Sequence, residues 1–474
     1  MRYHFQGFAF LACLLAIGVA AHADSLLTDL TLVDVETGTL TEGQSVLIRE
    51  GIVAGIGTDM TPTDGSDVIE GADGYLVPGL WDSHFHIFSG ATEPDTALPR
   101  YLLHGVAGIG DMGAPWPIEA QQELQARIKA GEVVGSSLVL SGAWVDGSPG
   151  SWPGMFLADT PDKARAVVDR IASEGWAAVK SYSMPDEPTC LALADAAEAE
   201  GLALVGHFPE RIALGTAIDA GTDGMEHFGR VTMACATAEA AMIADLRDTM
   251  AAGADLPSIF EIMAGQDRII LDTWDEALCA EILARIAVAG MHVSPTLVVA
   301  DFYTGNWPAP DAPRMRMIPA EVREARGRPD FRLEAMTDEE RALAEDSIAL
   351  YRLTFLKAHR AGVPIRTSSD ASFANRYLFH GFSLLDELDL YVEIGLTLRE
   401  ALCTATVAPP RFFDLRDHDG TIAPGRRADL ALLDANPLES LATLRRPRAV
   451  IAGGIIPDRA TLDALEATLL SEGE

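Results

Sequence analysis

The chain has 474 residues, with 70 acidic side chains against 35 basic ones and a formal net charge of −35. This balance excludes duplex nucleic acid or an anionic membrane surface as the partner, because both require clustered Lys and Arg. A hydrophobic fraction of 48% excludes a disordered chain, and five Cys are too few for a disulfide scaffold. The length allows a large core and more than one domain.

Residues 1–23 have the pattern of a secretory signal peptide. Arg2 precedes an apolar run over 8–19, and Ala21 and Ala23 are small residues at positions suited to cleavage. The run is too short to span a bilayer, which takes about 20 residues, although an uncleaved anchor is the alternative. We therefore expect an exported protein, periplasmic or secreted, that has no membrane contact once the signal is removed.

The cysteines beyond the signal peptide show no close spacing. Cys190, Cys279 and Cys403 lie in Ala- and Leu-rich helical patterns, where Cys is usually a small buried apolar residue. An oxidising compartment permits disulfides, and the pairing state of these three cysteines and of Cys235 stays open. The spacing argues against a CxxC-type metal or redox site.

Two regions of short strands flank a longer middle region. Residues 24–79 and 415–474 contain β-branched or apolar runs separated by turn residues such as Gly. Chain termini commonly lie close together at the surface of a domain. We therefore predict one small β-sandwich domain that is formed from both chain ends.

The middle region, 80–414, alternates between strand-like apolar runs and Ala-, Leu- and Glu-rich helices, as where 177–180 precedes a helix over 188–200. Such alternation implies parallel strands joined by right-handed crossovers, and eight such units form a (β/α)8 TIM-like barrel of the α/β class. The stretch 301–345 is rich in Pro, Arg and Met. We interpret it as a lid-like insertion, because long loops in a compact domain are usually functional.

Metal-capable side chains follow apolar runs at five places. In an extended chain alternate residues share a face, so His84 and His86 can bind one ion together. Single candidates follow at the other four places: Lys180, His207, His227 and Asp370. Each has a simpler interpretation alone, such as a structural His, a Lys that reaches solvent, or an Asp that caps a helix. Together, at strand ends where barrel chemistry occurs, these N and O ligands favour zinc or a similar divalent ion.

The same residues carry a resemblance to a known family. The segments concerned are PGLWD at 78–82 before HFH, VKSY and GHFP around Lys180 and His207, the EH pair that ends at His227, and the closing stretch 420–430. In this order they resemble the metal-dependent amidohydrolase superfamily, most strongly its imidazolonepropionase-like and prolidase-like branch. The resemblance covers nearly the whole chain after residue 23 and implies a hydrolase that acts on C–N bonds.

The resemblance also implies a binuclear centre with two divalent metal ions, of which zinc is favoured. His84 and His86 would hold the more buried ion with Asp370, and His207 and His227 would hold the second. Lys180 would bridge both ions after carboxylation by CO₂, which needs a neutral amine, and burial lowers the pKa of a Lys. A hydroxide shared by the ions would attack the substrate carbonyl, with Asp370 as the catalytic general base and then general acid.

Substrate contacts are predicted near these positions. Arg211, Arg230 and Arg376 each follow a ligand candidate closely, and Arg binds carboxylates in a bidentate manner, although solvated loop Arg residues are the alternative. Tyr182 shares a face with Lys180 and could donate to the carbonyl oxygen, and His380 is a further candidate contact. These residues favour a small-molecule substrate that is peptide-like or an N-acyl amino acid, as for a dipeptidase or carboxypeptidase.

Three alternatives keep the fold and change the function. A lactonase or esterase would use the same attack by hydroxide. A mononuclear deaminase would make Lys180 a bystander, and the presence of Lys180 at a strand end counts against it. A non-catalytic scaffold homologue is disfavoured because all six ligand positions are filled. The sequence leaves homo-oligomerisation open.

Overall fold

The computed structural model describes residues 24–474 apart from a few short gaps. These gaps are residue 63, 91–92, 114–115, 141–143, 153, 302–311, 319, 327–335, 373–374, 376, 416–419 and 473–474. The predicted signal peptide at 1–23 and the predicted substrate contact Arg376 therefore lie outside the described residues. Within the described part, none of the helices combines the length and the apolar character that crossing a bilayer requires.

One six-stranded sheet is formed from both ends of the chain. We call it the terminal sheet, and its strands are β1 (Ser25–Val33), β2 (Leu40–Arg49), β3 (Ile52–Gly57), β4 (Asp67–Pro78), β14 (Leu430–Leu433) and β15 (Ala449–Ile451). Its order is β15-β14-β4-β1-β2-β3, in which β1 and β4 are parallel and the other neighbours are antiparallel. Leu27, Val46, Leu76 and Leu430 belong to its buried apolar cluster. The described strands of the two ends thus share a single sheet, and a second sheet packed on it stays a prediction.

The last helix of the chain was not expected from the sequence. α18 (Arg459–Glu472) follows the terminal sheet and places Leu462, Leu465 and Leu469 against Leu102 and Leu103 of the middle region. Leucines spaced three and four residues apart lie on one side of a helix, which explains why this segment forms a helix and packs there. Residues 459–472 are therefore helical, whereas the sequence predicted short strands for 415–474.

The middle region contains two parallel sheets. The smaller sheet consists of β5 (Leu80–Phe85), β6 (Val106–Asp111) and β7 (Ser137–Leu140). The larger sheet has the order β13-β12-β11-β10-β8-β9, and its strands in chain order are β8 (Trp144–Asp146), β9 (Phe156–Leu157), β10 (Ala178–Ser181), β11 (Ala203–Gly206), β12 (Gly224–Glu226) and β13 (His292–Ser294). All neighbours in both sheets are parallel, so their carboxyl ends face the same way.

Isolated backbone contacts join the edges of the two parallel sheets. The amide of Ala177 donates to the carbonyl of Leu140 at 3.0 Å, next to β10 and at the end of β7. On the other side, Ile365 pairs with Val293 of β13, and Ser372 pairs with His86 just after β5. The segment 365–372 thus lies between β13 and β5. The ladders themselves remain divided between two sheets, so the alternation predicted for the barrel is present while a continuous barrel is not defined by strand pairing.

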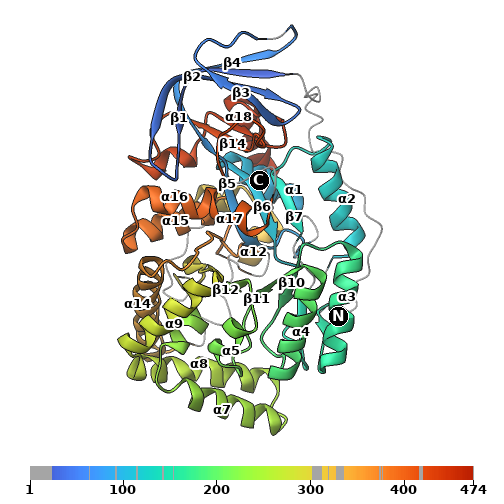
Figure 1. The fold of residues 1–474 in the computed structure, drawn as a ribbon, viewed down its shortest axis with the longest axis vertical. Helices are drawn as coiled ribbons and strands as arrows, with labels where there is room; N and C mark the ends of the chain where they lie inside the picture. The colour runs from blue at the N-terminus through green and yellow to red at the C-terminus, as the bar shows by residue number, and fades with distance from the viewer. Residues whose placement is uncertain are drawn as a thin grey trace.

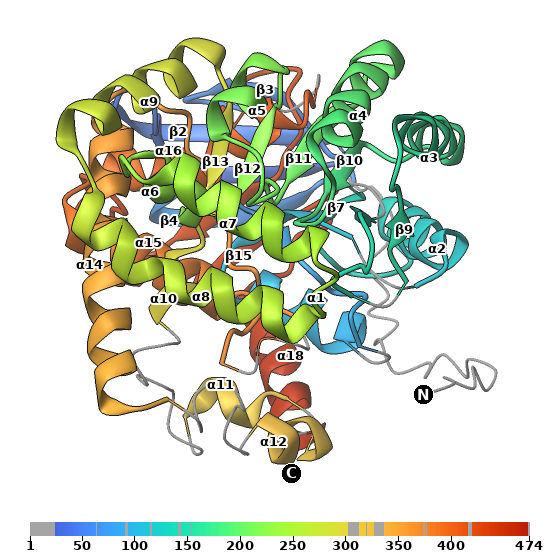
Figure 2. The ribbon, with the colours of Figure 1, turned by 90° about the horizontal axis from the view of Figure 1, so that it is seen from below.

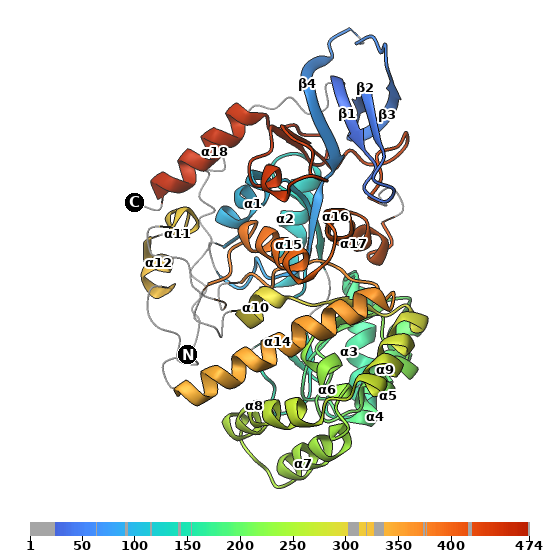
Figure 3. The same ribbon diagram turned by 90° about the vertical axis from the view of Figure 1, so that its left-hand side faces the viewer.

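Helices alternate with these strands. In chain order they are α1 (Glu93–Leu103), α2 (Ile118–Lys129), α3 (Pro161–Glu174), α4 (Glu187–Glu200), α5 (Leu214–Asp219), α6 (Gly229–Ala234), α7 (Glu239–Ala251), α8 (Leu256–Thr273), α9 (Glu276–Ala289), α10 (Leu297–Asp301), α11 (Pro313–Arg316), α12 (Ala320–Arg326), α14 (Asp338–Arg360), α15 (Phe382–Ile394), α16 (Leu398–Thr406), α17 (Ala408–Phe412) and the 3₁₀ helix η2 (Leu441–Arg445). The terminal sheet lies at one end of the molecule, and α7 and α8 lie at the other (Figures 1 and 3). Seen from below, α7 and α8 cross in front of the larger parallel sheet (Figure 2).

Local sequence explains where these helices begin and end. The side chain of Asp186 accepts the backbone amide of Thr189 at the start of α4, and Gly201 ends that helix with a φ of 68°. An Asp cap satisfies an amide that has no partner inside the helix, and Gly adopts a left-handed conformation without a steric penalty. The next strand, β11, can therefore begin two residues after this glycine, at Ala203.

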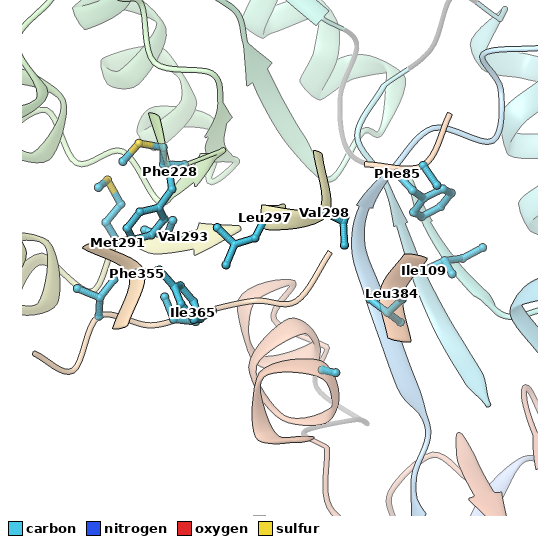
Figure 4. Packing of buried hydrophobic residues seen from close by; sticks show 14 of the residues in the cluster. Phe85, Ile109, Phe228, Met291, Val293, Leu297, Val298, Phe355, Ile365 and Leu384 are labelled. Atoms are coloured by element: carbon cyan, nitrogen blue, oxygen red, sulfur yellow. The ribbon is translucent and has the colours of Figure 1, made fainter. Parts of the chain in front are cut away.

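The largest buried apolar cluster includes Phe85 of β5, Val179 of β10 and Leu204 of β11. Figure 4 shows Phe228, Met291, Val293, Phe355 and Ile365 gathered on one side, and all of these belong to the largest buried cluster. Interiors of this kind are close-packed, so they leave little freedom to the backbone around them. The cluster therefore fixes the strands whose ends carry the candidate ligands.

The predicted insertion 301–345 is described in part. Its described residues form α11, α12 and the start of α14, and the remainder falls in the gaps given above. Arg326, at the end of α12, is buried and donates to the backbone carbonyls of Leu378 at 2.8 Å and Ser372 at 3.1 Å. α12 thus packs against the segment that follows Asp370, and a lid role stays a prediction.

The structure contains a disulfide between Cys235 and Cys279, which are 44 residues apart. Cys235 ends α6 and Cys279 lies in the first turn of α9, and both side chains are fully buried. Cys279 is buried in a helix as expected, and its pairing, which the sequence left open, arises because two helices distant in sequence pack against each other in the fold. Cys190 and Cys403 are free, with Cys190 buried and Cys403 half-buried.

Candidate metal centre

His84, His86 and Asp370 lie together at the carboxyl end of β5. One possible ligand atom from each lies within 4.8 Å of the others. The Oδ1 atom of Asp370 is 3.5 Å from Nε2 of His84 and 3.4 Å from Nε2 of His86. The backbone explains this proximity, because the amide of Asp370 donates to the carbonyl of His84 at 2.8 Å. Two imidazoles and a carboxylate at these distances are a donor set suited to zinc or a similar ion.

Lys180 lies in the same cluster, in β10. Its side chain is fully buried, and Nζ is 3.3 Å from Nε2 of His84. Burial lowers the pKa of Lys180 to about 8, although the carboxylates of Glu226 and Asp370 act to raise it. About a tenth of the amine is therefore neutral at pH 7 and about half at pH 8, and the neutral amine is the form that can react with CO₂ or bind a metal.

His207 and His227 complete the group that the sequence predicts. His207 follows β11 and His227 follows β12, and their ring centroids are 4.3 Å apart. The ring of His227 is also 4.8 Å from the ring of His84. The structure thus brings together all six candidate ligands, which come from five separate segments of the chain.

Three of the four imidazoles are oriented through Nδ1. This atom lies 2.7 Å from Oε2 of Glu226 in His84, 2.7 Å from the carbonyl oxygen of Gly113 in His86, and 2.7 Å from Oγ1 of Thr296 in His227. The carboxylate of Glu226 and the carbonyl of Gly113 can only accept, so they favour the proton of His84 and His86 on Nδ1 and leave Nε2 with a lone pair, which is the usual arrangement of a metal-binding His. The hydroxyl of Thr296 can donate or accept, so it orients the ring of His227 without fixing its tautomer. Burial also lowers the pKa of His84 to about 3 and that of His227 to about 4, so both rings are neutral at pH 7.

The carboxylate of Asp370 is held in its ionised form. Burial alone would raise its pKa, but His84, His86 and His227 together hold the pKa well below its usual range. Its Oδ2 atom also accepts a hydrogen bond from Nδ2 of Asn375 at 3.0 Å. Asp370 is therefore a fixed, charged oxygen donor at the centre of the cluster.

Left-handed backbone conformations gather at this site. His227, Thr296 and Asp370 have φ values of 128°, 47° and 49°, which non-glycine residues rarely adopt. Such residues persist only where the surrounding structure holds them, and they occur preferentially at functional sites. Here the hydrogen bond between His227 and Thr296 joins two of the three.

Sequence reasoning assigned no role to Glu226 and Arg366. Nη2 of Arg366 donates to Oε1 of Glu226 at 2.9 Å, and both side chains are fully buried. Burial alone would raise the pKa of Glu226, but His84, Arg366 and Lys180 hold it well below its usual range. The EH pair at 226–227 was the available signal, whereas the pairing with Arg366 depends on a contact 140 residues away.

Two further buried carboxylates support the loops around β5. Asp82 accepts hydrogen bonds from the amide of Ser369 at 3.0 Å and from the hydroxyl of Tyr101 at 3.1 Å. Asp111 accepts from the amides of Ile87 and Gly113, both at 2.9 Å. Burial raises the pKa of each to about 7. These acids hold the backbone next to His86 and Asp370 and lie behind the candidate ligands.

The predicted substrate contacts occupy different positions. Tyr182 stacks on the ring of His207, with a centroid distance of 4.1 Å and an interplanar angle of 20°, so it lies directly at the centre. Arg211 donates from Nε to the carbonyl of Pro185 at 3.1 Å and from Nη2 to the carbonyl of Met184. Arg211 therefore binds the backbone carbonyls of a neighbouring loop and stabilises that loop.

The other two described candidates are enclosed by protein. Arg230 is buried, donates from Nη2 to the carbonyl of Ile212 at 2.5 Å, and lies 3.5 Å from Glu239. His380 is fully buried with Nε2 3.7 Å from Oε1 of Glu93, and its ring faces Phe85 and Tyr101. These surroundings favour a structural role for both side chains.

The residues present fit a metal centre. Every candidate ligand offers an N or O donor, His84 and His86 present Nε2 toward Asp370, and burial lowers the pKa of the Lys180 amine. Metal binding requires deprotonated ligands, and the lowered pKa values of His84, His227 and Asp370 meet that requirement.

Comparison with known proteins agrees with this chemistry. The sequence profile of the Amidohydrolase family matches residues 182–456, which is more than half of the chain. The chain therefore belongs to the amidohydrolase family, a family of hydrolases, and the resemblance stated from the sequence is confirmed.

Solved structures share the fold. The chain is similar to a bottromycin amidohydrolase with a TM-score of 0.70 and 22% identity, covering 95% of this chain and 90% of that one. A Xaa-Pro dipeptidase with bound methionine aligns with a TM-score of 0.64 and 19% identity over 92% of this chain and 100% of that one. A putative prolidase from Bifidobacterium longum gives 0.64 and 20%, covering 94% of this chain and 99% of that one. At these identities the likeness shows the fold alone.

Curated relatives match over shorter segments. Adenine deaminase 2 of Rhizobium etli is 26% identical over 200 residues, or 39% of this chain and 31% of the relative. The adenine deaminase of Ruegeria pomeroyi is 35% identical over 85 residues, or 18% of this chain and 14% of the relative. The chain thus matches about a third or less of the length of these relatives.

Proposed function

We propose that the protein is an exported, binuclear metal-dependent hydrolase that cleaves the amide C–N bond of a small peptide-like or N-acyl amino acid substrate. The observation that carries this proposal is the position of Lys180, fully buried and 3.3 Å from His84 within a cluster of four imidazoles and Asp370. An unpaired ammonium at that place would repel any bound cation. A carboxylated amine would instead offer two oxygens to a pair of ions.

Carboxylation follows from the chemistry of the site. The neutral amine of Lys180 would attack CO₂, form a C–N bond, and release one proton as the carbamate appears. The lowered pKa of Lys180 supplies the neutral amine. We propose that His84, His86 and Asp370 hold one ion, that His207 and His227 hold the other, and that the carbamate oxygens link them, zinc being the ion that this donor set favours.

Bound divalent ions would lower the pKa of a bound water molecule and would polarise the substrate carbonyl. Asp370 then accepts the proton of the attacking water and delivers it to the departing nitrogen, for which an ionised carboxylate at the centre is required. Tyr182 donates a hydrogen bond from its hydroxyl to the carbonyl oxygen. Burial raises the pKa of Tyr182, so the hydroxyl keeps this proton at working pH.

The proposal extends to domain organisation and location. The two parallel sheets and the segment 365–372 would together form the predicted barrel over 80–414, with the terminal sheet as a separate small domain of 24–79 and 415–474. Export is supported by the buried disulfide between Cys235 and Cys279, because disulfides persist mainly in oxidising compartments. We propose that the protein binds a small molecule and that it binds neither nucleic acid nor a membrane.

A deaminase is the second candidate. It is favoured by the similarity to adenine deaminases over up to 200 residues, and it would also break a C–N bond. The two candidates differ in the nitrogen that leaves, which is an amine of the substrate chain in one case and ammonia from a purine-like ring in the other.

One screen separates these candidates. The protein purified with zinc is incubated with dipeptides, N-acyl amino acids, lactams, lactones and adenine, and the released amine, acid or ammonia is measured. We expect amine release from members of the first two classes, and a loss of about 10² to 10⁴ in rate with Asp370→Asn. Release from adenine alone would establish the deaminase, and release from lactones alone would establish an esterase-type activity.

A further inference from the structure

A half-exposed tryptophan lies beside the candidate centre. Trp152 belongs to the loop between β8 and β9, at the carboxyl edge of the larger sheet, and 49% of its side chain is exposed. Its Nε1–H donates to the hydroxyl oxygen of Tyr182 at 2.8 Å. Because Tyr182 stacks on His207, the indole is linked through one residue to the group of candidate ligands.

A second tryptophan extends the same wall. The ring of Trp144 is 6.3 Å from Tyr182 and 5.5 Å from His86, and its Nε1–H donates to the carbonyl of Met112 at 2.8 Å. Three aromatic side chains thus follow one another from His86 to Trp152. Aromatic faces and edges of this kind are the surfaces on which proteins bind rings and large apolar groups.

The loop that carries Trp152 is anchored by a buried carboxylate. Asp146 is fully buried and accepts the amides of Gly147 at 2.9 Å, Ser151 at 2.7 Å and Met184 at 2.7 Å. The backbone at Gly147 lies so near the carbonyl of Met184 that a Cβ there would be 2.4 Å from that oxygen. These hydrogen bonds anchor the loop at Gly147 and at Ser151, which immediately precedes Trp152, and such anchoring lowers the entropy lost when a ligand binds.

The hydrogen bond between Trp152 and Tyr182 also sets the direction of the tyrosine hydroxyl. The oxygen of Tyr182 accepts from the indole, so its own proton points elsewhere and remains available as a donor. The two residues therefore offer an apolar surface and a hydrogen-bond donor next to each other, which is what a carbonyl flanked by a large apolar group requires.

We infer that Trp152 is a specificity-determining residue that binds a ring or another large apolar group of the substrate, next to the carbonyl that Tyr182 contacts. The inference rests on the proposed function and deepens it by naming the substrate class: peptide-like or N-acyl compounds with an aromatic or large aliphatic substituent. It assigns a function to the exposed face of the indole, which packing within the protein does not use.

Binding of two non-reactive probes tests this inference without turnover. Isothermal titration with 3-phenylpropionate and propionate compares ligands that differ in a phenyl ring alone. We expect the wild-type protein to bind 3-phenylpropionate about tenfold more tightly, Trp152→Ala to reduce this ratio to about twofold, and Trp152→Phe to retain most of it. Equal affinity for both probes in the wild type, or an unchanged ratio in Trp152→Ala, would overturn the inference.

A matched control is Phe260→Ala, which removes another half-exposed aromatic side chain, 45% exposed in α8, and should leave the ratio unchanged. Circular dichroism verifies that the variants fold, and the comparison of the two probes on the wild type still tests the inference if Trp152→Ala does not. If the screen of amides shows no turnover while the ratio still depends on Trp152, the proposed reaction fails and the binding surface stands. If amides are cleaved but the ratio is independent of Trp152, the inference fails alone.

Discussion

The carboxylate of Glu226 lies between His84 and Arg366. Its Oε2 atom is 2.7 Å from Nδ1 of His84, and its Oε1 atom accepts from Nη2 of Arg366 at 2.9 Å. All three side chains are buried, so the interaction is little weakened by solvent. Glu226 therefore places the proton of His84 on Nδ1 and turns Nε2 toward Lys180 and Asp370.

Glu226→Gln should weaken metal binding while His84 itself stays in place. A neutral amide orients the imidazole less firmly and lowers its basicity, and changes of this kind cost about 10- to 100-fold in metal affinity. We also expect a loss of stability of about 3–5 kcal/mol, because Arg366 is left as an uncompensated buried charge. Competition with a chelator measures the affinity, and urea unfolding measures the stability.

The control for this variant is Asp223→Asn. Asp223 immediately precedes β12, the strand that ends at Glu226, and it accepts the amide of Leu204 at the opposite end of the sheet. Asp223→Asn should leave metal affinity unchanged. If Glu226→Gln binds metal as tightly as the wild type, the orienting role assigned to Glu226 is wrong.

Removal of Lys180 should change the metal content. Protein purified with zinc should hold close to two ions per chain, whereas Lys180→Ala should hold one or fewer, because no bridging carbamate can form. The rate of turnover should fall together with the metal content, and adding short carboxylic acids should restore part of the metal content and part of the rate. Metal analysis by mass spectrometry measures the content, with Lys129→Ala as the control, since Lys129 is exposed at the end of α2. If Lys180→Ala still binds two ions per chain, Lys180 is not a ligand of the metal centre.

The buried amine of Lys180 also predicts how stability depends on pH. Burial lowers its pKa from 10.5 to about 8. Between these values the unfolded chain binds a proton that the folded chain has lost, so the free energy of unfolding rises with pH across this window. One pKa unit corresponds to about 1.4 kcal/mol, so the gain approaches about 3 kcal/mol.

Urea unfolding of metal-free protein in CO₂-free buffer at pH 7.5 and pH 10 measures this gain. Other groups also titrate over the window, so the relevant quantity is the difference between wild type and Lys180→Met. We expect the stability of the wild type to rise relative to the variant as the pH increases. A parallel pH dependence of the two proteins would show that Lys180 does not lose its proton more easily in the folded state.

The sequence predicted the candidate ligands because they lie at the ends of apolar strands. Hydrophobic runs locate strands, and parallel strands place their carboxyl ends on one side, so His207 and His227 could be assigned to the same place as His84. The same reasoning could not find Arg366, because its pairing with Glu226 depends on which two segments lie side by side after folding.

Spacing along the chain also could not separate the functions of similar residues. Arg211 and Arg230 both follow a candidate ligand closely, yet one holds the carbonyls of a neighbouring loop and the other is enclosed near Glu239. Trp152 lies near the centre although no ligand is close to it in sequence. A residue that follows a ligand in the chain has its backbone near the centre, whereas packing decides whether its long side chain points toward the centre or away from it.

The disulfide between Cys235 and Cys279 gives the last prediction. It closes a loop of 44 residues between α6 and α9, and cross-links of this size stabilise a fold by about 2–4 kcal/mol. Replacing both cysteines by Ala should lower the free energy of unfolding by this amount, and a reducing agent should do the same to the wild type. Cys190→Ala, at a buried free Cys, is the control: it keeps the cross-link, so a reducing agent should lower its stability as much as that of the wild type. A wild type insensitive to reductant, with free thiols by mass spectrometry, would contradict the cross-link and remove its support for export.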